Sequence, residues 1–79
     1  MPTRAAHRHP DPFAAFRDKY PALVSYPQAE EITQTSVRTL KRLTASGELP
    51  CYRVGRTRTY RLRLDDVLAL LQPVAGSAA

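Results

Sequence analysis

Two short helical segments separated by three residues constrain the fold of this chain most. Ser25 and Gln28 have the spacing of a capping box, and the helix that they start is expected to end near Ile32. Ser36 is typical of the N-cap of a second helix, and Gly47 of its left-handed C-cap. A connection this short does not let two helices run antiparallel with full overlap, so the pattern predicts an angled helix-turn-helix.

A β-hairpin is expected directly after the second helix. The segments Cys51–Val54 and Thr59–Leu62 flank a turn at Gly55–Arg58, which gives two short strands joined by a four-residue loop. Alternation along the strands predicts one apolar face and one cationic face. The expected apolar face contains Tyr52, Val54, Tyr60 and Leu62, and the expected cationic face contains Arg53, Thr59, Arg61 and Arg63.

A further helix is expected on each side of this unit. Asp11 fits the N-cap of the first, and Phe13, Phe16 and Tyr20 recur on one of its faces. Asp65 fits the N-cap of the last helix, in which Val67, Leu68, Leu70 and Leu71 form an apolar stripe. The predicted fold class is therefore α+β, mainly helical: a winged helix-turn-helix with a two-stranded antiparallel wing and two additional helices.

The 79 residues suffice for one small domain and not for two. A single cysteine cannot form an internal disulfide, and no apolar run approaches a signal-peptide core or a spanning helix, so we expect a cytoplasmic protein without membrane contact. The predicted segments are a disordered basic arm at 1–10, a domain at 11–73 with an N-terminal helix (11–21), a helix-turn-helix (25–47), a wing (51–63) and a C-terminal helix (65–72), and a frayed tail at 74–79.

The charge of the chain is segregated along the sequence. The formal net charge is +5, but residues 36–63 alone contain eight basic residues and one acid, which is +7. Acidic residues flank this block on both sides. Such segregation indicates a surface that faces a polyanion, and nucleic acid is the commonest polyanion in the cytoplasm.

Outward positions of the second helix suit the major groove of B-form DNA once Leu40 and Leu43 face the core. We expect Arg38 and Lys41 to contact base edges and Arg42 to contact phosphate. Arg56 and Arg58, at the hairpin tip, are expected to enter an adjacent minor groove. The predicted DNA-binding residues are Ser36, Val37, Arg38, Lys41 and Arg42 on the helix and Arg53, Arg56, Thr57, Arg58 and Arg61 on the wing.

From Ser25 to Leu71 the chain closely resembles the excisionase-like and MerR-like winged helix-turn-helix domains. The most specific stretch is SGELPCYRVGRTRTYRL, where the family has a helix C-cap glycine, a buried Leu-Pro and a basic wing. The chain departs from the family at three positions. Glu30 replaces the family's usual second alanine, Gln34 replaces its turn glycine, and Thr35 replaces its apolar turn residue. The resemblance implies double-stranded DNA as the ligand.

Two roles are implied by the resemblance. One is a recombination directionality factor, or excisionase, of a phage or mobile element, which bends attachment-site DNA and redirects a cognate integrase toward excision. The other is a small MerR-like transcriptional regulator or repressor without a recombination role. Because the chain ends soon after the last helix, without the long dimerisation helix of full MerR regulators, the excisionase role is favoured, in the nucleoid of a bacterial host cell.

Other readings stay open beside these. An adaptor that binds RNA or protein is a third function class.

The stripe of Phe13, Phe16 and Tyr20 is most often part of the core, and the alternative is a face for self-association along DNA. The protein is not expected to be an enzyme, because the sequence contains no recognisable arrangement of a nucleophile and a base. No cofactor or metal is expected, because His7 and His9 with one cysteine lack the paired spacing of zinc sites.

Overall fold

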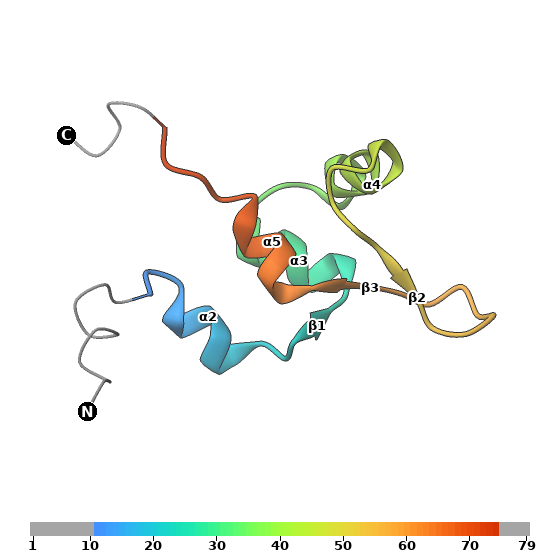
Figure 1. Ribbon diagram of the computed structural model, residues 1–79, viewed down its shortest axis with the longest axis horizontal. Helices are drawn as coiled ribbons and strands as arrows, with labels where there is room; N and C mark the ends of the chain where they lie inside the picture. Colours follow the sequence, from blue (N-terminus) through green and yellow to red (C-terminus); the bar gives the residue numbers. More distant parts are fainter. Residues whose placement is uncertain (1–10, 75–79) are drawn as a thin grey trace.

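The computed structural model describes residues 11–74, and the predictions for the arm at 1–10 and for the tail beyond Val74 lie outside this range. The elements α3 and α5 lie in the middle of the molecule, with α2 at one end and the β2–β3 hairpin at the other (Figure 1). In chain order the elements are α2 (Ala14–Lys19), β1 (Leu23–Val24), α3 (Tyr26–Thr33), α4 (Val37–Ser46), β2 (Tyr52–Arg53), β3 (Tyr60–Arg63) and α5 (Leu64–Ala69). This arrangement is the predicted α+β winged helix-turn-helix.

The predicted caps define both helices of the helix-turn-helix. Ser25 and Gln28 form a complete capping box: the Ser25 Oγ accepts the Gln28 N–H at 3.2 Å, and the Ser25 N–H donates to the Gln28 Oε1 at 2.9 Å. The Ser36 Oγ accepts the Thr39 N–H at 3.2 Å and starts α4. Gly47 ends α4 at φ +88°, in the left-handed region. These helices therefore begin and end where local chemistry dictates.

The turn between α3 and α4 depends on a non-glycine residue in the left-handed region. Gln34 has φ +60° and ψ +29°, and it lies where the resembling domains have glycine. A residue with a Cβ costs about 1 kcal/mol or more in this conformation. The Gln34 Nε2 donates to the Glu31 carbonyl at 2.8 Å, which ties the side chain back over the helix end. The short angled turn is thus kept without glycine.

The sheet has three strands, where the sequence predicted two. Its order is β1-β3-β2, and both pairings are antiparallel. The added strand pairs Leu23 with Arg63 and Val24 with Leu62. Two residues carry too short a pattern to be recognised as a strand, and β1 exists because β3 offers it a free edge. The consequence is that β3 becomes the central strand.

The predicted faces of the wing are wrong. Val54 and Thr59 close the four-residue loop through the Val54 N–H, which donates to the Thr59 carbonyl at 2.9 Å. A loop of even length sets even-numbered residues of one strand opposite odd-numbered residues of the other, and opposite residues share a face. Tyr52 therefore pairs with Arg61, and Arg53 pairs with Tyr60.

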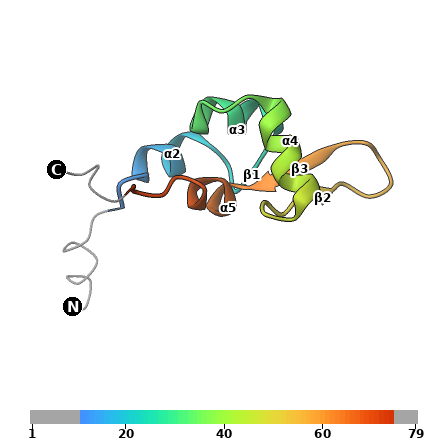
Figure 2. The same ribbon diagram turned by 90° about the horizontal axis from the view of Figure 1, so that it is seen from above.

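Burial of the wing side chains depends on their position along the hairpin and not on the face they share. Of the four residues expected on the apolar side, Leu62 alone is buried, at 0% exposure. The other three are exposed by 46%, 51% and 42%: Tyr52, Val54 and Tyr60. Leu62 belongs to the buried core cluster, whereas the outer part of the hairpin extends past the helices (Figure 2). The wing therefore has a core-bound base and a solvent-exposed outer half.

Both flanking helices are shorter than predicted. The predicted start at Asp11 is a turn, in which the Asp11 Oδ1 accepts the Phe13 N–H at 2.9 Å, and α2 begins at Ala14 and ends at Lys19. The last helix, α5, begins at Leu64, so Asp65 lies in its first turn and is not its cap. The Asp65 carboxylate still complements the positive end of the helix dipole.

The core draws on nearly every element, which makes the described part of the chain one packed unit. Leu40 from α4, Leu62 from β3 and Val67 from α5 are each 0% exposed. Leu43 packs against this cluster, so α4 buries the face that was predicted. The buried hydrophobic residues are Tyr20, Val24, Ala29, Ile32, Leu40, Leu49, Leu62, Leu64, Val67 and Leu68. No helix within 11–74 has the length and hydrophobicity to cross a membrane.

Candidate nucleic-acid interface

The outward face of α4 carries cations that the described part of the chain leaves unpaired. Leu40 anchors the helix in the core, so the opposite side faces solvent. Arg38, Lys41 and Arg42 are exposed, and Val37 is half-buried. Within residues 11–74, neither Arg38 nor Arg42 has a hydrogen bond or ion pair through its side chain. Their charge is therefore available to a ligand.

The tip of the wing presents two more such cations. Arg56 and Arg58 are exposed, and neither side chain meets a protein partner among the described residues. The loop that carries both arginines is shaped by local contacts: Gly55 has φ +60°, and the Thr57 Oγ1 donates to the Val54 carbonyl at 2.6 Å. Of the predicted wing residues, Thr57 thus stabilises the turn, while both arginines project from it.

The other two predicted wing arginines are tethered to the backbone. The Arg53 Nε donates to the Gly55 carbonyl at 3.1 Å, and the Arg61 Nη1 donates to the Tyr60 carbonyl at 2.9 Å. Arg53 is exposed, and Arg61 is half-buried. Each uses one donor on the hairpin itself and has others left, since a guanidinium carries five N–H groups.

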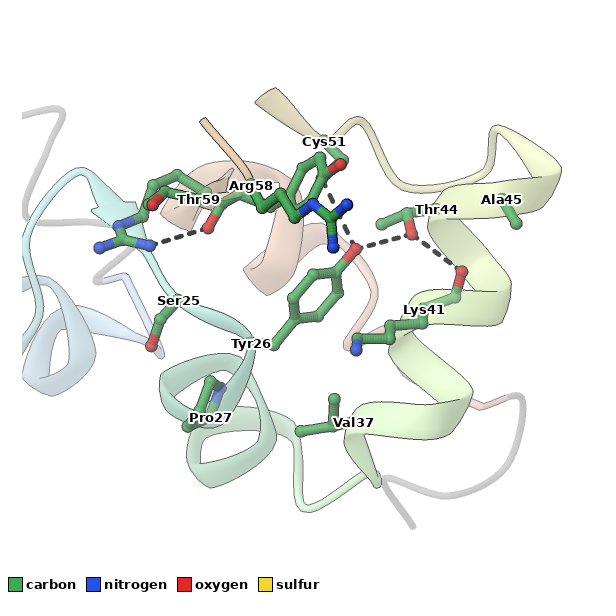
Figure 3. Close-up of a pocket in the computed structure, with 12 residues that line it drawn as sticks. Ser25, Tyr26, Pro27, Val37, Lys41, Thr44, Ala45, Cys51, Arg58 and Thr59 are labelled. Atoms are coloured by element: carbon green, nitrogen blue, oxygen red, sulfur yellow. Dashed lines mark hydrogen bonds between the residues drawn. The ribbon is translucent and has the colours of Figure 1, made fainter. Parts of the chain in front are cut away.

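A groove of about 1000 Å³ separates α4 from the wing. Figure 3 shows Lys41 and Arg58 extending toward Tyr26 from two sides of this groove. The lining residues are Ser25, Tyr26, Pro27, Val37, Lys41, Thr44, Ala45, Cys51, Arg58, Thr59, Tyr60 and Arg61. Of the predicted site residues, the groove brings together Val37 and Lys41 from α4 with Arg58 and Arg61 from the wing. Outside its lining lie Ser36, Arg38, Arg42, Arg53, Arg56 and Thr57.

Tyr26 is a site residue that the sequence did not single out. Its hydroxyl lies 2.8 Å from the Thr44 Oγ1 and 3.5 Å from the Cys51 Sγ. The Lys41 Nζ lies 5.6 Å from the centroid of its ring, within the range of a cation–π contact. Burial raises the pKa of Tyr26 above its ordinary value of 10.0, so the hydroxyl keeps its proton at neutral pH. In the sequence, the feature that could have indicated a role for Tyr26 was its position as an aromatic residue in the first turn of α3.

The predicted aromatic stripe of the N-terminal helix packs onto the domain. Tyr20 is only 9% exposed, and its hydroxyl donates to the Glu31 Oε1 at 2.7 Å. Phe13 and Phe16 are half-buried against the core, with the Phe16 ring 6.2 Å from Phe13 and 6.4 Å from Tyr20 between centroids. This packing fits the core interpretation, and self-association through the stripe stays a prediction.

Arginines on the far side from the groove are paired with acids. The Arg17 guanidinium forms ion pairs with Asp11, at 2.5 Å, and with Asp65. The Arg63 guanidinium lies 3.7 Å from the Asp65 carboxylate and 4.0 Å from that of Asp66. This set of five residues, called the rear ion cluster below, links α2 to α5. Its acids neutralise the arginines beside them and leave little net charge on this side.

Comparison with known proteins agrees with the geometry. Residues 23–73 match the family model described as "Helix-turn-helix domain", which includes β1, both central helices, the wing and α5. Over 49 residues the chain is 43% identical to "Transcriptional repressor DcmR" of Methylorubrum extorquens. This stretch is 62% of the chain and 18% of that relative, so the chain spans less than a fifth of the relative's length. The chain belongs to the helix-turn-helix domain family and is a sequence-specific DNA-binding domain.

Proposed function

We propose that this domain regulates transcription by binding a specific duplex site with α4 in the major groove and the wing against the adjacent backbone and minor groove. The observation that carries the proposal is the unpaired charge of Arg38, Arg42, Arg56 and Arg58, which the fold leaves exposed on α4 and at the wing tip. A cation without a protein partner gains most from a phosphate or an acceptor on a base.

The outward residues of α4 divide the contacts between bases and backbone. Arg38 follows the N-terminus of α4 by one turn or less, the part of a recognition helix that reaches base edges in a major groove. A guanidinium pairs with guanine O6 and N7 through two N–H groups, which gives it sequence preference. Arg42 lies one turn further along and meets phosphate, which adds affinity without sequence preference.

The regulatory role is supported by the relative. DcmR is named a transcriptional repressor, and the matched stretch is long enough to include a whole helix-turn-helix with its wing. A domain of this kind represses by occupying promoter DNA, which requires binding and no catalysis. We therefore propose a non-enzymatic regulator.

An excisionase is the second candidate function. It is favoured by the stretch from Ser46 to Leu62, whose glycine cap, Leu-Pro and basic hairpin resemble the excisionase-like domains. In this role the protein binds repeated attachment sites, bends them and cooperates with an integrase. Exposed arginines at a hairpin tip suit the narrowed minor groove of bent DNA.

The test starts from a selection of bound duplexes out of a random library, followed by footprinting on the gene's own promoter and on the attachment site of a neighbouring mobile element. A regulator protects the promoter and lowers the expression of a reporter placed behind it. An excisionase protects the attachment site and raises the yield of excision by the element's integrase. Equal affinity for single-stranded RNA and for duplex DNA would contradict both proposals.

The matched control for each assay is a pair of variants with the same loss of charge. Arg38→Ala removes a proposed base contact, whereas Arg17→Ala removes a charge from the rear ion cluster. The proposal expects loss of protection with the first variant and full protection with the second. Equal protection by both variants would show that α4 does not read the site.

A further inference from the structure

The groove between α4 and the wing has the chemistry of an anion site. Lys41, Arg58 and Arg61 line it together with several hydroxyl groups, and its lining contains no carboxylate. All of these lining residues belong to the described part of the chain. The hydroxyl side chains are Ser25, Tyr26, Thr44, Thr59 and Tyr60. The hydroxyls of Ser25, Tyr26 and Thr44 donate to partners within the protein, so the groove attracts a phosphodiester chiefly through cations that no acid neutralises.

Lys41 is the residue of α4 that is directed at this groove. Val37, Lys41 and Thr44 lie on one strip of the helix, at spacings of four and three residues, and all three line the groove. Arg38 and Arg42 lie further round the helix and are not part of the groove lining. The helix therefore presents one cation to the groove and two to the surface beyond it.

Within the part of the chain that the structure describes, the Lys41 ammonium has only a weak partner. Its ammonium lies 5.6 Å from the centroid of the Tyr26 ring, and no carboxylate is within ion-pair distance in the described part of the chain. An exposed cation–π contact is weaker than a charged hydrogen bond to a phosphate, so a phosphate in the groove draws the ammonium away from the ring. Across the groove, the Arg58 side chain has no partner to lose among residues 11–74.

Tyr26 connects the two walls of the groove through a chain of hydrogen bonds. The Thr44 Oγ1 donates to the Lys41 carbonyl at 2.9 Å, so it accepts from the Tyr26 hydroxyl 2.8 Å away. The Tyr26 oxygen then accepts from the Cys51 thiol at 3.5 Å. Cys51 directly precedes β2. The chain of bonds thus runs from the base of the wing, through Tyr26, to the backbone of the recognition helix.

We infer that the groove holds one backbone phosphate of the bound duplex between Lys41 and Arg58, and that Tyr26 is the positioning residue that fixes the spacing of these two cations. The inference rests on the proposed binding mode of α4 and the wing. It gives Lys41 a phosphate contact, where the sequence predicted a base-edge contact. It also assigns a role to three residues outside the predicted site: Tyr26, Thr44 and Cys51.

The test uses a selected duplex in which single phosphates are replaced, one at a time, by neutral methylphosphonates. For the unmodified protein, we expect one replacement to weaken binding by about tenfold, because it removes a charge-assisted contact. The same replacement has little further effect on Lys41→Ala and on Arg58→Ala, since the partner is already absent. Arg42→Ala is the matched control, and it keeps the full effect of that replacement.

The Tyr26→Phe variant tests the positioning role. It keeps the ring under Lys41 and removes the hydroxyl that joins Thr44 to Cys51. We expect a several-fold loss of affinity for the unmodified duplex and no loss for the duplex with the critical methylphosphonate. Equal losses on both duplexes would overturn the positioning role. Thermal unfolding confirms that the variant is folded.

Other outcomes separate this inference from the proposed function. If specific binding is found but Lys41 and Arg58 respond to two different phosphates, or to none, the groove does not hold a shared phosphate and the binding mode still stands. If no duplex is bound in preference to others, the inference and the proposed function both fail.

Discussion

Arginines on the two sides of this domain have opposite environments. Arg17 and Arg63 lie in the rear ion cluster, where carboxylates neutralise them, whereas Arg38, Arg56 and Arg58 have no carboxylate within ion-pair distance among the residues described. The same side chain therefore stabilises contacts within the fold on one side and is left for a ligand on the other. Unpaired charge identifies the binding surface better than the net charge of +5 does.

The difference follows from where the acids lie in the sequence. Asp65 and Asp66 lie in the first turn of α5, two and three residues after Arg63, and Asp11 precedes α2. The segment from 36 to 63 contains a single acidic residue, Glu48. Its carboxylate accepts a hydrogen bond from the Ser46 hydroxyl at 3.2 Å. Among the residues described, no carboxylate therefore lies within ion-pair distance of Arg56 or Arg58 at the wing tip.

Removing both tip arginines tests the comparison most strongly. Arg56→Ala combined with Arg58→Ala should weaken binding to every duplex by roughly a hundredfold at low salt, because two phosphate contacts are lost. The slope of log affinity against log salt should become shallower by about 2. Fluorescence titrations at several salt concentrations measure both quantities.

The control removes two charges from the rear ion cluster. Arg17→Ala combined with Arg63→Ala changes the net charge by the same amount, and it should leave the salt slope unchanged. If the two double variants lose affinity equally, net charge governs binding and the contrast between the two sides of the domain has no functional meaning.

Within the binding surface, Arg38 and Arg42 should differ in kind. Arg38→Ala should reduce the ratio of specific to non-specific affinity by about thirtyfold, because a bidentate base contact discriminates by about 2 kcal/mol. Arg42→Ala should weaken both affinities alike. Competition binding with selected and scrambled duplexes measures the ratios. Equal ratios for the two variants would show that α4 does not divide its contacts in this way.

Phe16 tests whether the aromatic stripe belongs to the fold or to an interface. Its half-buried ring packs between Phe13 and Tyr20, so Phe16→Ala should lower the free energy of unfolding by about 1–2 kcal/mol, part of the cost at a fully buried site. Thermal unfolding measures the loss. Binding to tandem sites should keep the cooperativity of the unmodified protein. Lost cooperativity at an unchanged Tm would instead indicate self-association through α2.

The rear ion cluster should give the smallest effect and a distinct pH dependence. The Phe13 N–H and the Arg17 guanidinium hold the pKa of Asp11 below its ordinary value of 3.8. A lowered pKa in the folded state stabilises the fold above the ordinary value, and this contribution is lost as the pH falls through the folded-state pKa. The Tm of the unmodified protein should therefore decrease once the pH is lowered below about 4.

Arg17→Ala should reduce this acid sensitivity and lower the Tm at neutral pH by a few degrees at most, because its ion pairs are exposed. DNA affinity should stay the same. Unfolding curves between pH 7 and pH 2 measure the effect, with Lys19→Ala as a neighbouring change of equal charge. An identical pH profile for both variants would exclude the ion pair between Arg17 and Asp11 as the source of the acid sensitivity.

The sequence predicted the parts of the fold that depend on local chemistry. The capping box at Ser25, the cap at Ser36 and the left-handed Gly47 were identified because each acts within a few residues. The strand at Leu23–Val24 was missed because it exists only through pairing with β3, about 40 residues later in the chain. The wing faces were misassigned because register is set by loop length as well as by alternation.

The candidate site shows the same limit. The exposure of the cations on α4 follows from helical periodicity once Leu40 is buried, so it was predictable. The place of Tyr26 was not, because its partners come from α4 and from the start of the wing. Contacts between elements require their packing angle, and no pattern in one segment contains it.

The hairpin also bears on how such domains diversify. Its base is tied to the core through Leu62, while the loop at Gly55–Arg58 contributes no residue to the core cluster. Changes in the length or charge of this loop therefore cost the domain little stability. Substitutions at these four loop residues can change the affinity for DNA during evolution, while the sequence preference of α4 and the fold stay the same.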